Sequence, residues 1–417
     1  MSSLAAQPGP SATDRGATGR PMRSMAAQIL GKTFVRWGAR IGVAWIAVLV
    51  LLAVFGPVIA NSYPLGVKID GRWASPAAAR FTPVDVMLFV GFFAAVALTA
   101  LRPIMRRHRA KVWLAIMLVT IPLAMWLVHP PTNAVYEQYR EEAAVGRLEA
   151  VVWAPIPYSP SDRLRDVPVD QRESAPWWTL NEQSPQRARM HWLGTDTYHQ
   201  DVAGRMIHAA RVALTIGFIA TGIAAVIGII VGGIMGYFAG AVDLVGMRVI
   251  EIFEFIPQLF LLLMFVAFFE RNIYLIMIII GLTSWPGNAR YIRAEFLRIR
   301  KQDYVQAAIA TGLPLRSVLF RHMLPNGITP VLVSASFGVA SAIIAEATLS
   351  FLGLGLPPED PSWGELLNQA TTGTGTFTWW IATFPGLAIF ITVFAYVLIG
   401  EALRDAIDPH TQRAMQM

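Results

Sequence analysis

The sequence predicts an all-α membrane protein that crosses the bilayer about eight times. Of its 417 residues, 55% are hydrophobic and only 15% are charged, whereas a typical soluble domain carries about 25% charged residues. The mean hydropathy is +0.49, and apolar stretches close to the roughly 20 residues that cross a bilayer as a helix recur along the chain. This composition excludes disorder for the bulk of the chain, because disordered chains are poor in apolar residues.

Eight apolar stretches are candidate spans. The second and third are short and joined by a basic link, which predicts a hairpin over 84–128. The fifth and sixth are divided only by Glu270, Arg271 and Asn272, which indicates a tight turn between two spans. The eight stretches lie approximately at 41–60, 84–101, 112–128, 212–237, 256–270, 273–288, 328–349 and 379–399.

The positive charges predict the orientation of the spans. The formal net charge is +7, and the excess of Lys and Arg lies in segments 1–40, 102–111 and 289–327. Lys and Arg accumulate in cytoplasmic loops, so we expect these segments inside and the acid-rich segments 129–210 and 350–378 outside. Eight spans then place both termini in the cytoplasm. The basic charge therefore needs no nucleic-acid partner to explain it.

These features divide the chain into parts with different environments. We expect the Ser-, Gly- and Pro-rich start of the chain to be a disordered tail. The predicted parts are a cytoplasmic tail at 1–38, N-terminal membrane helices at 39–128, an external Pro- and Trp-rich loop at 129–210, a core at 211–402 that includes a cytoplasmic loop at 292–326 and an external loop at 350–378, and a cytoplasmic tail at 403–417.

The cytoplasmic loop at 292–326 predicts two short helices outside the membrane. Asp303 can cap the first helix, and Gly312 suits the left-handed residue that ends it. Pro314 suits the first turn of a second helix, which Pro325 would end before the next span. The result would be a helix–turn–helix at the membrane surface.

Two interpretations of this loop fit its composition. Small residues at Ala307 and Ala308 would let another protein approach closely, and an exposed Tyr304 would add contact area. An ordinary amphipathic helix lying in the membrane interface would have a similar composition. Composition alone leaves both open.

The loop resembles a known family. The pattern Ala307-Ala308, Gly312 and Leu324-Pro325 has the spacing of the EAA loop of ATP-binding-cassette importer permeases, and the string from Tyr304 to Asn326 is similar to the peptide-importer branch. Gln306 stands where the motif has Glu. Three further stretches resemble the same family in the same order, namely His191–Asp196, Phe351–Gly364 and Gly400–Pro409.

Together these stretches cover roughly 191–410, and the chain is identified as a member of the dipeptide/oligopeptide permease family, C-type subunit. The long external insertion is similar in kind to that of the microcin C and oligopeptide permeases. The resemblance implies a type I permease core of five to six helices, to which this chain adds an N-terminal hairpin. It implies a subunit that forms the path for peptides or similar small solutes and does no chemistry itself.

The resemblance also implies partners and a location. They are a sister permease subunit in a heterodimer, two ATP-binding subunits that carry the ATP and Mg²⁺, and an external solute-binding protein, at a bacterial cytoplasmic (inner) membrane. This chain would bind no cofactor. The loop at 303–326 would be the coupling helix, held in a groove of an ATPase subunit. Its implied coupling residues are Asp303, Tyr304, Ala307, Ala308, Gly312, Arg316, Arg321, His322, Leu324 and Pro325.

Two features within the spans are further candidates. Gly228, Gly232, Gly236 and Gly240 recur every four residues, which favours close packing of two helices, with a hinge as the alternative. Glu346 lies near the outer end of the seventh span. Carboxylates inside a membrane are often functional, so Glu346 is either part of the solute pathway or a hydrogen-bonded structural group.

Other kinds of function find less support. Gly31-Lys32-Thr33 lacks the glycine that a P-loop requires five residues earlier. The histidines at 191, 199 and 208 have no standard zinc spacing, and the chain has no cysteine, so we expect no metal site. The alternative class is an ion- or proton-coupled secondary carrier, which would need ionisable residues near mid-membrane and often inverted repeats. The substrate stays open among peptides, nickel, opines and peptide antibiotics.

Overall fold

The computed structural model describes residues 33–100, 108–131, 133–269, 271–372 and 377–407. Residues 1–32 of the predicted N-terminal tail, most of the basic link at 102–111 and residues 408–417 of the predicted C-terminal tail, which include the Asp408-Pro409 end of the last motif, lie outside the described residues. Within them the chain is mostly helical, which confirms the predicted fold class.

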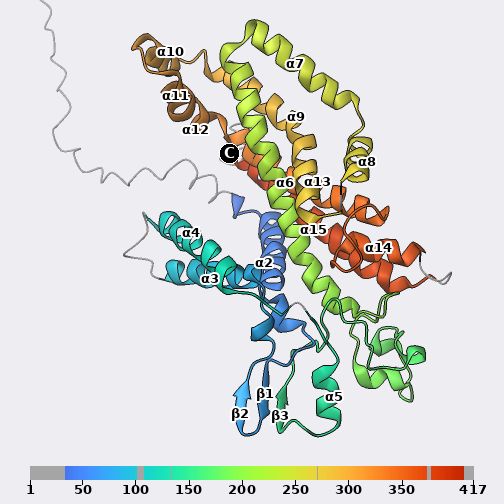
Figure 1. The fold of residues 1–417 in the computed structure, drawn as a ribbon. Coiled ribbons are helices and arrows are strands. Elements are labelled where there is room, and N and C mark those ends of the chain that lie inside the picture. Colours follow the sequence, from blue (N-terminus) through green and yellow to red (C-terminus); the bar gives the residue numbers. More distant parts are fainter. Residues whose placement is uncertain (1–32, 101–107, 132, 270, 373–376, 408–417) are drawn as a thin grey trace, which may run out of the picture.

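Six described helices are long and apolar enough to cross a membrane (Figure 1). A bent helix pair, α7 (Gly240–Phe255) and α8 (Gln258–Phe268), makes a seventh if it is counted as one span. The eight predicted spans are therefore an approximate count. The six helices are α2 (Trp37–Ile59), α3 (Pro83–Ala100), α4 (Arg109–Leu127), α6 (Val202–Phe238), α13 (Thr329–Phe351) and α15 (Trp379–Ile407).

The fifth predicted span, at 256–270, is not a straight membrane helix. Helix α8 has 11 residues, or about 16 Å at 1.5 Å per residue, which is too short for a hydrocarbon core of about 30 Å. The helix bends by 78° from α7, because Pro257 disfavours helical geometry at the preceding residue and Ile256 is extended. The sixth predicted span lies in α9 (Ile273–Ile299), whose second half is polar.

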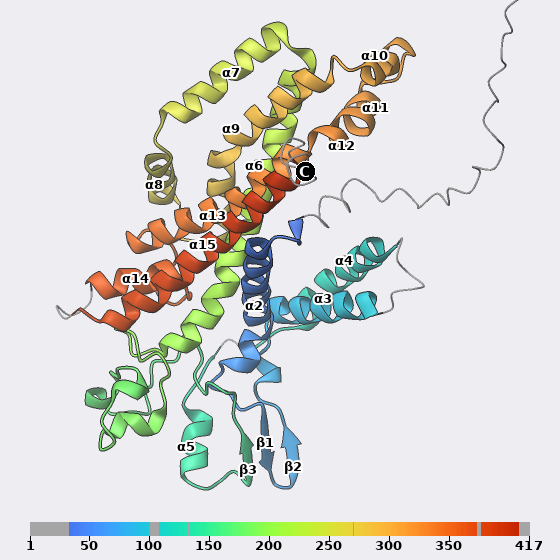
Figure 2. The same ribbon diagram turned by 180° about the vertical axis from the view of Figure 1, so that it is seen from behind.

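Helix α6 is the centre of the fold. It runs beside α9 over much of its length and packs on α2 and α13 (Figure 1). The apolar residues Leu49, Ala210, Ile343 and Tyr396 come from α2, α6, α13 and α15 and form one buried cluster. Seen from behind, α15 runs beside α13 (Figure 2), and it also packs on α2. These helices form the packed core of the protein.

The extra hairpin, α3 and α4, projects from one side of this core (Figure 1). Phe55 on α2 packs edge-on against Phe92 on α3, with ring centroids 5.3 Å apart. Arg211 on α6 donates to the Asp85 carboxylate at 2.6 Å. Few residues of the hairpin are otherwise buried, so most of its surface is left for lipid.

At the end of the molecule opposite the loop at 303–326 lies a small sheet that the sequence analysis did not predict (Figure 1). Strands β1 (Gly66–Ile69), β2 (Arg72–Ala74) and β3 (Ala150–Val152) are antiparallel in the order β2-β1-β3, beside α5 (Gln138–Ala144). Both turn residues between β1 and β2, Asp70 and Gly71, have positive φ, as a two-residue type I′ hairpin requires. The sheet and α5 occupy the lower end of the molecule in Figure 1.

The remaining elements are short and lie at the two ends of the core. At the sheet end are α14 (Trp363–Thr372) and four 3₁₀ turns, η1 (Ala78–Arg80), η2 (Val169–Gln171), η3 (Trp177–Thr179) and η4 (Pro185–Arg189). At the opposite end are α10 (Asp303–Ala310), α11 (Leu315–Ser317), the π-helical turn η5 (Val318–Met323) and α12 (Leu324–Gly327).

Candidate functional site: a polar cavity and a surface loop

A cavity of about 600 Å³ lies between α6, α7, α8, α9 and α13. Its volume is in the range of small-ligand sites. Its wall combines apolar side chains with many hydroxyls and amides, and the charged lining residue is Glu254. The polar lining residues besides Glu254 are Thr221, Gln258, Thr283, Ser284, Asn288, Tyr291, Ser334 and Ser341.

Hydrogen bonds between helices hold this polar wall in place. Gln258 on α8 donates to the Ser284 hydroxyl on α9 at 3.0 Å. Ser334 on α13 donates to the Asn288 side-chain oxygen on α9 at 2.8 Å. Helix α9 therefore supplies one wall of the cavity. Its hydrogen bonds hold α8 and α13 against that wall. Pro286 lies inside α9 and does not end it.

The glycines of α6 set the distance between α6 and α9. A methyl group at Gly228, Gly232 or Gly236 would overlap atoms of Asn288, Ala289 or Phe296, so only glycine permits this close approach. The fourth glycine of the predicted stripe, Gly240, takes no part in the packing. It begins α7 with a φ of +56° and has open space around it, so its role is in the turn.

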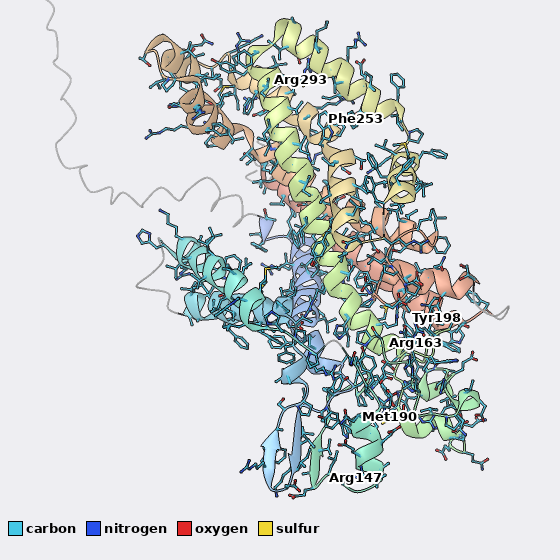
Figure 3. All side chains as sticks on the ribbon, in the orientation of Figure 1. Arg147, Arg163, Met190, Tyr198, Phe253 and Arg293 are labelled. Carbon is cyan, nitrogen blue, oxygen red and sulfur yellow. The ribbon has the colours of Figure 1, made fainter. Side chains whose placement is uncertain are left out.

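Two ion pairs fasten α7 to α9. Arg293 makes two contacts with the Asp243 carboxylate, and Arg290 pairs with Glu254 at the cavity wall. Phe253 packs on Trp285 with ring centroids 5.4 Å apart. Figure 3 shows Arg293 near the start of α7 and Phe253 near its far end, so α7 is held at both ends.

The surface loop at 303–326 has the predicted helical character but differs in its details. Gly312 has a φ of +74°, as expected of the residue after α10. The residue at the helix cap is Gln302, whereas Asp303 is the first helical residue and makes no capping bond. Pro314 lies just before α11 and not in its first turn.

Pro325 does not end the second helical segment, which continues through α12 almost directly into α13. Proline has no N–H to offer the carbonyl four residues earlier, and its ring crowds that carbonyl. The turn before it, η5, is π-helical, a wider winding that accommodates such a defect. Where we predicted that Pro325 ends the helix, the helix instead changes its pitch locally and continues.

One face of the loop is buried against the core. Val305, Ala308 and Met323 pack in one cluster with Phe296 and Ile299 of α9. Ala308 is thus an internal packing residue, whereas its neighbour Ala307 is exposed. This contact makes α9 and the loop one continuous packed unit.

The opposite face of the loop is apolar and exposed. Of the other residues that the sequence analysis assigned to this loop, Arg316, Arg321 and Pro325 are exposed, and His322 and Leu324 are partly buried. The sequence analysis did not assign four exposed apolar residues of the loop to this surface. The sequence offers a signal for them, namely large apolar side chains in a short loop rich in Arg. The exposed apolar face comprises Tyr304, Ile309, Leu313, Leu315 and Phe320, with 38–64% of each residue accessible.

Glu346 lies outside the cavity wall. The residue is 3% exposed, and its carboxylate accepts hydrogen bonds from the hydroxyls of Ser350 and Ser362 at 2.8 Å each. It joins the end of α13 to the loop that follows. These contacts are those of a hydrogen-bonded structural group, which is one of the two roles that the sequence left open.

Helix α6 begins in a buried polar cluster. Asp201 caps α6 by accepting from the Gly204 N–H at 2.7 Å and also contacts His191 at 2.9 Å. Arg205 is fully buried and lies 3.5 Å from Asp196. Burial raises the pKa of Asp196, and the Arg205 guanidinium opposes that shift.

Two of the three histidines of this segment, His191 and His208, contact different groups. His208 contacts the Ala60 carbonyl oxygen at 3.1 Å, whereas His191 contacts the Asp201 carboxylate. Among the described residues, no group of three His, Asp or Glu side chains is arranged to hold a metal ion. At the surface nearby, Arg163 stacks over the Tyr198 ring, 5.7 Å from its centroid (Figure 3).

A bundle of membrane-crossing helices around a polar cavity, with a helical loop exposed at one end, defines a membrane permease. Residues 228–413 match the family described as the inner membrane component of binding-protein-dependent transport systems. The chain belongs to this family and is a permease subunit of an ABC importer. No finding supports the alternative of a secondary carrier.

Three relatives have names that specify transport. The Haemophilus influenzae oligopeptide permease OppC is 36% identical, over 56% of this chain and 74% of its own length. The Agrobacterium fabrum peptidoglycan transport permease YejE is 35% identical, over 62% of this chain and 71% of its own. The Escherichia coli inner membrane ABC transporter permease YejE is 32% identical, over 88% of this chain and 92% of its own. The last similarity extends well beyond the 191–410 region on which the sequence resemblance rested.

Proposed function

We propose that this subunit forms half of a translocation path for peptides. The observation that carries the proposal is the cavity of about 600 Å³ with its wall of hydroxyls and amides. Such groups donate to and accept from the backbone amides that all peptides share, and the apolar wall accommodates varied side chains. The Arg290–Glu254 pair leaves this wall without a net charge, so the cavity does not depend on a charged substrate.

A second permease subunit completes this path. The exposed face of α8 carries large apolar side chains next to the cavity, with Phe260 67% and Phe268 80% exposed. An exposed apolar face in a membrane protein can also meet lipid, but the polar cavity that α8 lines has to be closed off from lipid, which favours a protein neighbour here. We assign this face to the sister subunit of a heterodimer, and the external end of the chain to the binding protein that delivers the substrate.

The loop at 303–326 couples this subunit to an ATPase. Its apolar face, from Tyr304 to Phe320, is exposed at the end of the molecule opposite the sheet (Figure 1). Its other face is packed on α9, which lines the cavity. Because packed elements move as rigid bodies, a displacement of the loop by the ATPase would move the cavity wall. ATP and Mg²⁺ bind to the two ATPase subunits, and this chain does no chemistry.

The same assignment fixes the orientation. The loop and its Arg residues face the cytoplasm, as the distribution of positive charge favours. Arg36 before α2 pairs with Asp405 near the end of α15, so the described ends of the chain meet, and they lie at the cytoplasmic side. The sheet then lies outside, and the membrane is the inner membrane of a bacterium.

The test is ATP-driven uptake into proteoliposomes by the complete complex of both permease subunits, both ATPases and the binding protein. We expect uptake of a labelled oligopeptide, with a peptidoglycan fragment as a competitor because a relative is named for that substrate.

Phe320→Ala should reduce uptake with little change in complex assembly. Val145→Ala, which removes a side chain of similar exposure (70%) near the sheet, should leave uptake unchanged. Equal uptake by the two variants would contradict the coupling role of the loop.

A further inference from the structure

Three exposed tryptophans gather beside the start of α15. Trp178, Trp192 and Trp379, here called the rim cluster, are 47%, 46% and 41% exposed. The first two come from the external insertion, and the third is the first residue of α15. Such aromatic area is unusual on a surface that faces only water, and nothing in the transport function described above requires it.

Ring contacts connect the insertion to the membrane helix. Trp178 packs edge-on against Phe384, with centroids 6.2 Å apart. Trp379 packs on the same Phe384 ring at 6.0 Å. In the insertion, Trp177 packs edge-on against Trp192 at 6.2 Å. Trp178 and Trp379 therefore share the Phe384 ring, and Trp192 is connected to them through Trp177, the sequence neighbour of Trp178.

The position of Phe384 fixes the depth of the rim cluster. Between Trp379 and Glu401, no residue of α15 carries a charge. About 20 residues cross the hydrocarbon core, so a crossing that ends near Ile399 begins near Trp380. Phe384 lies five residues into α15, about 7 Å along the helix from Trp379. Trp178 therefore reaches the outer boundary of the hydrocarbon.

The insertion is held firmly at this depth. Trp380 donates its indole N–H to the Thr195 carbonyl at 3.0 Å. Leu193 and Trp380 both pack on a buried cluster shared by α6, α14 and α15. The backbone N–H of Trp177 donates to the His191 carbonyl oxygen at 3.1 Å. The segment therefore cannot be displaced from the membrane end of α15 without breaking buried contacts.

We propose that segment 176–193 rests on the outer leaflet of the membrane, with Trp178, Trp192 and Trp379 anchored in the lipid headgroup region. Indole rings combine a large apolar surface with one N–H donor, and tryptophan is enriched at this interface for that reason. The external insertion then rests on the membrane surface beside the start of α15. It holds the outer end of the core in place and gives the sheet a fixed position above the bilayer.

The absence of cysteine from the chain permits a direct test by single-cysteine spin labelling. Trp178→Cys and Trp192→Cys place a label in the rim cluster, and Trp73→Cys on β2 is the matched control. Trp73 is 61% exposed and lies in the sheet, away from the membrane helices. Each full-length variant is reconstituted with its sister permease subunit in vesicles, and collisions with oxygen and with a water-soluble nickel chelate are measured.

We expect labels at 178 and 192 to collide more with oxygen and less with the chelate than the label at 73. Chelate collisions at 178 and 192 equal to those at 73 would overturn the proposal, because the segment would then face water. Low collision with both reagents would also overturn it, because protein would then cover the cluster. Phe377→Cys, at a residue that is 72% exposed, provides a further label beside α15 if a tryptophan replacement prevents assembly.

Discussion

Helix α6 and the hairpin of α3 and α4 are all apolar enough to cross a membrane, yet they differ in their environment. The pair of α6 and α9 is packed through glycines that bring the backbones together, and 39% of the most apolar stretch of α6 is buried. The hairpin of α3 and α4 is held by one ion pair and a few aromatic rings, and only 6% of the corresponding stretch of α4 is buried. Hydropathy thus identifies a membrane helix, whereas the spacing of small residues shows which helix belongs to the protein interior.

The strongest test of this difference is a side chain added at the α6–α9 contact. Gly232→Leu places atoms where the backbone of Ala289 lies, and because backbone cannot move aside as a flexible side chain can, we expect the cost to exceed the about 1–3 kcal/mol that is typical of overpacking. We expect loss of the folded protein in a detergent thermal-stability assay. Gly222→Leu is the matched control, because Gly222 lies on the same helix with open space around it. Similar melting temperatures for both variants would refute the close packing.

The attachment of the hairpin provides the next largest effect. Asp85→Asn removes the charge that Arg211 pairs with, in a contact whose carboxylate is 5% exposed. Breaking a buried pair from one side costs about 3–5 kcal/mol, and we expect the lower end because the Arg211 side chain is 20% exposed. Protease accessibility of the hairpin should rise together with a drop in melting temperature. The control Glu149→Gln breaks the exposed pair with Lys68 and should change neither.

A lipid-facing residue of the hairpin should show almost no effect. Leu118 on α4 is 77% exposed, so Leu118→Ala exchanges one lipid contact for another. Ile280→Ala on α9, at a residue that is 1% exposed, should cost about 2–5 kcal/mol. A large loss of stability for Leu118→Ala in the purified subunit would show that another part of the protein covers α4.

The external end of α6 adds a pH-dependent effect, the smallest of the four. Burial raises the pKa of Asp196 above its ordinary value, so the folded state binds this proton more tightly than the unfolded state does. The contribution of Asp196 to stability is therefore greatest at low pH and falls as the pH rises through its folded pKa. The stability of the wild type relative to Asp196→Asn should increase as the pH is lowered from 7. A difference that is constant with pH would contradict the shift.

Sequence reasoning succeeded where a local rule decides the structure. Gly312 was expected in the left-handed region and has a φ of +74°, because few other residues tolerate that conformation. Most of the apolar stretches form spanning helices, because length and apolarity suffice, whereas the stretch at 256–270 forms only the short helix α8. The Asp70-Gly71 turn is also a local signal, but the apolar strands around it are too short to stand out beside the membrane spans.

It failed where tertiary contacts decide. Ala307 and Ala308 are identical in sequence, and only the packing of Val305 and Met323 on α9 shows that Ala308 faces inward. The same is true of Glu346, whose serine partners lie 4 and 16 residues away. The cavity could not be predicted either, because its wall combines residues of five helices. The exposed apolar face of the loop emerged only when its buried face was known.

The central claim is that the loop at 303–326 is the surface on which an ATPase acts. Site-specific crosslinking tests it most directly, with a photoreactive residue at Phe320 or Leu315 and a control at Val145, all in the cysteine-free full-length chain. We predict that residues 320 and 315 crosslink to the ATPase subunit and that residue 145 does not. Crosslinking of 320 and 315 to lipid alone, with no ATPase adduct, would contradict the account.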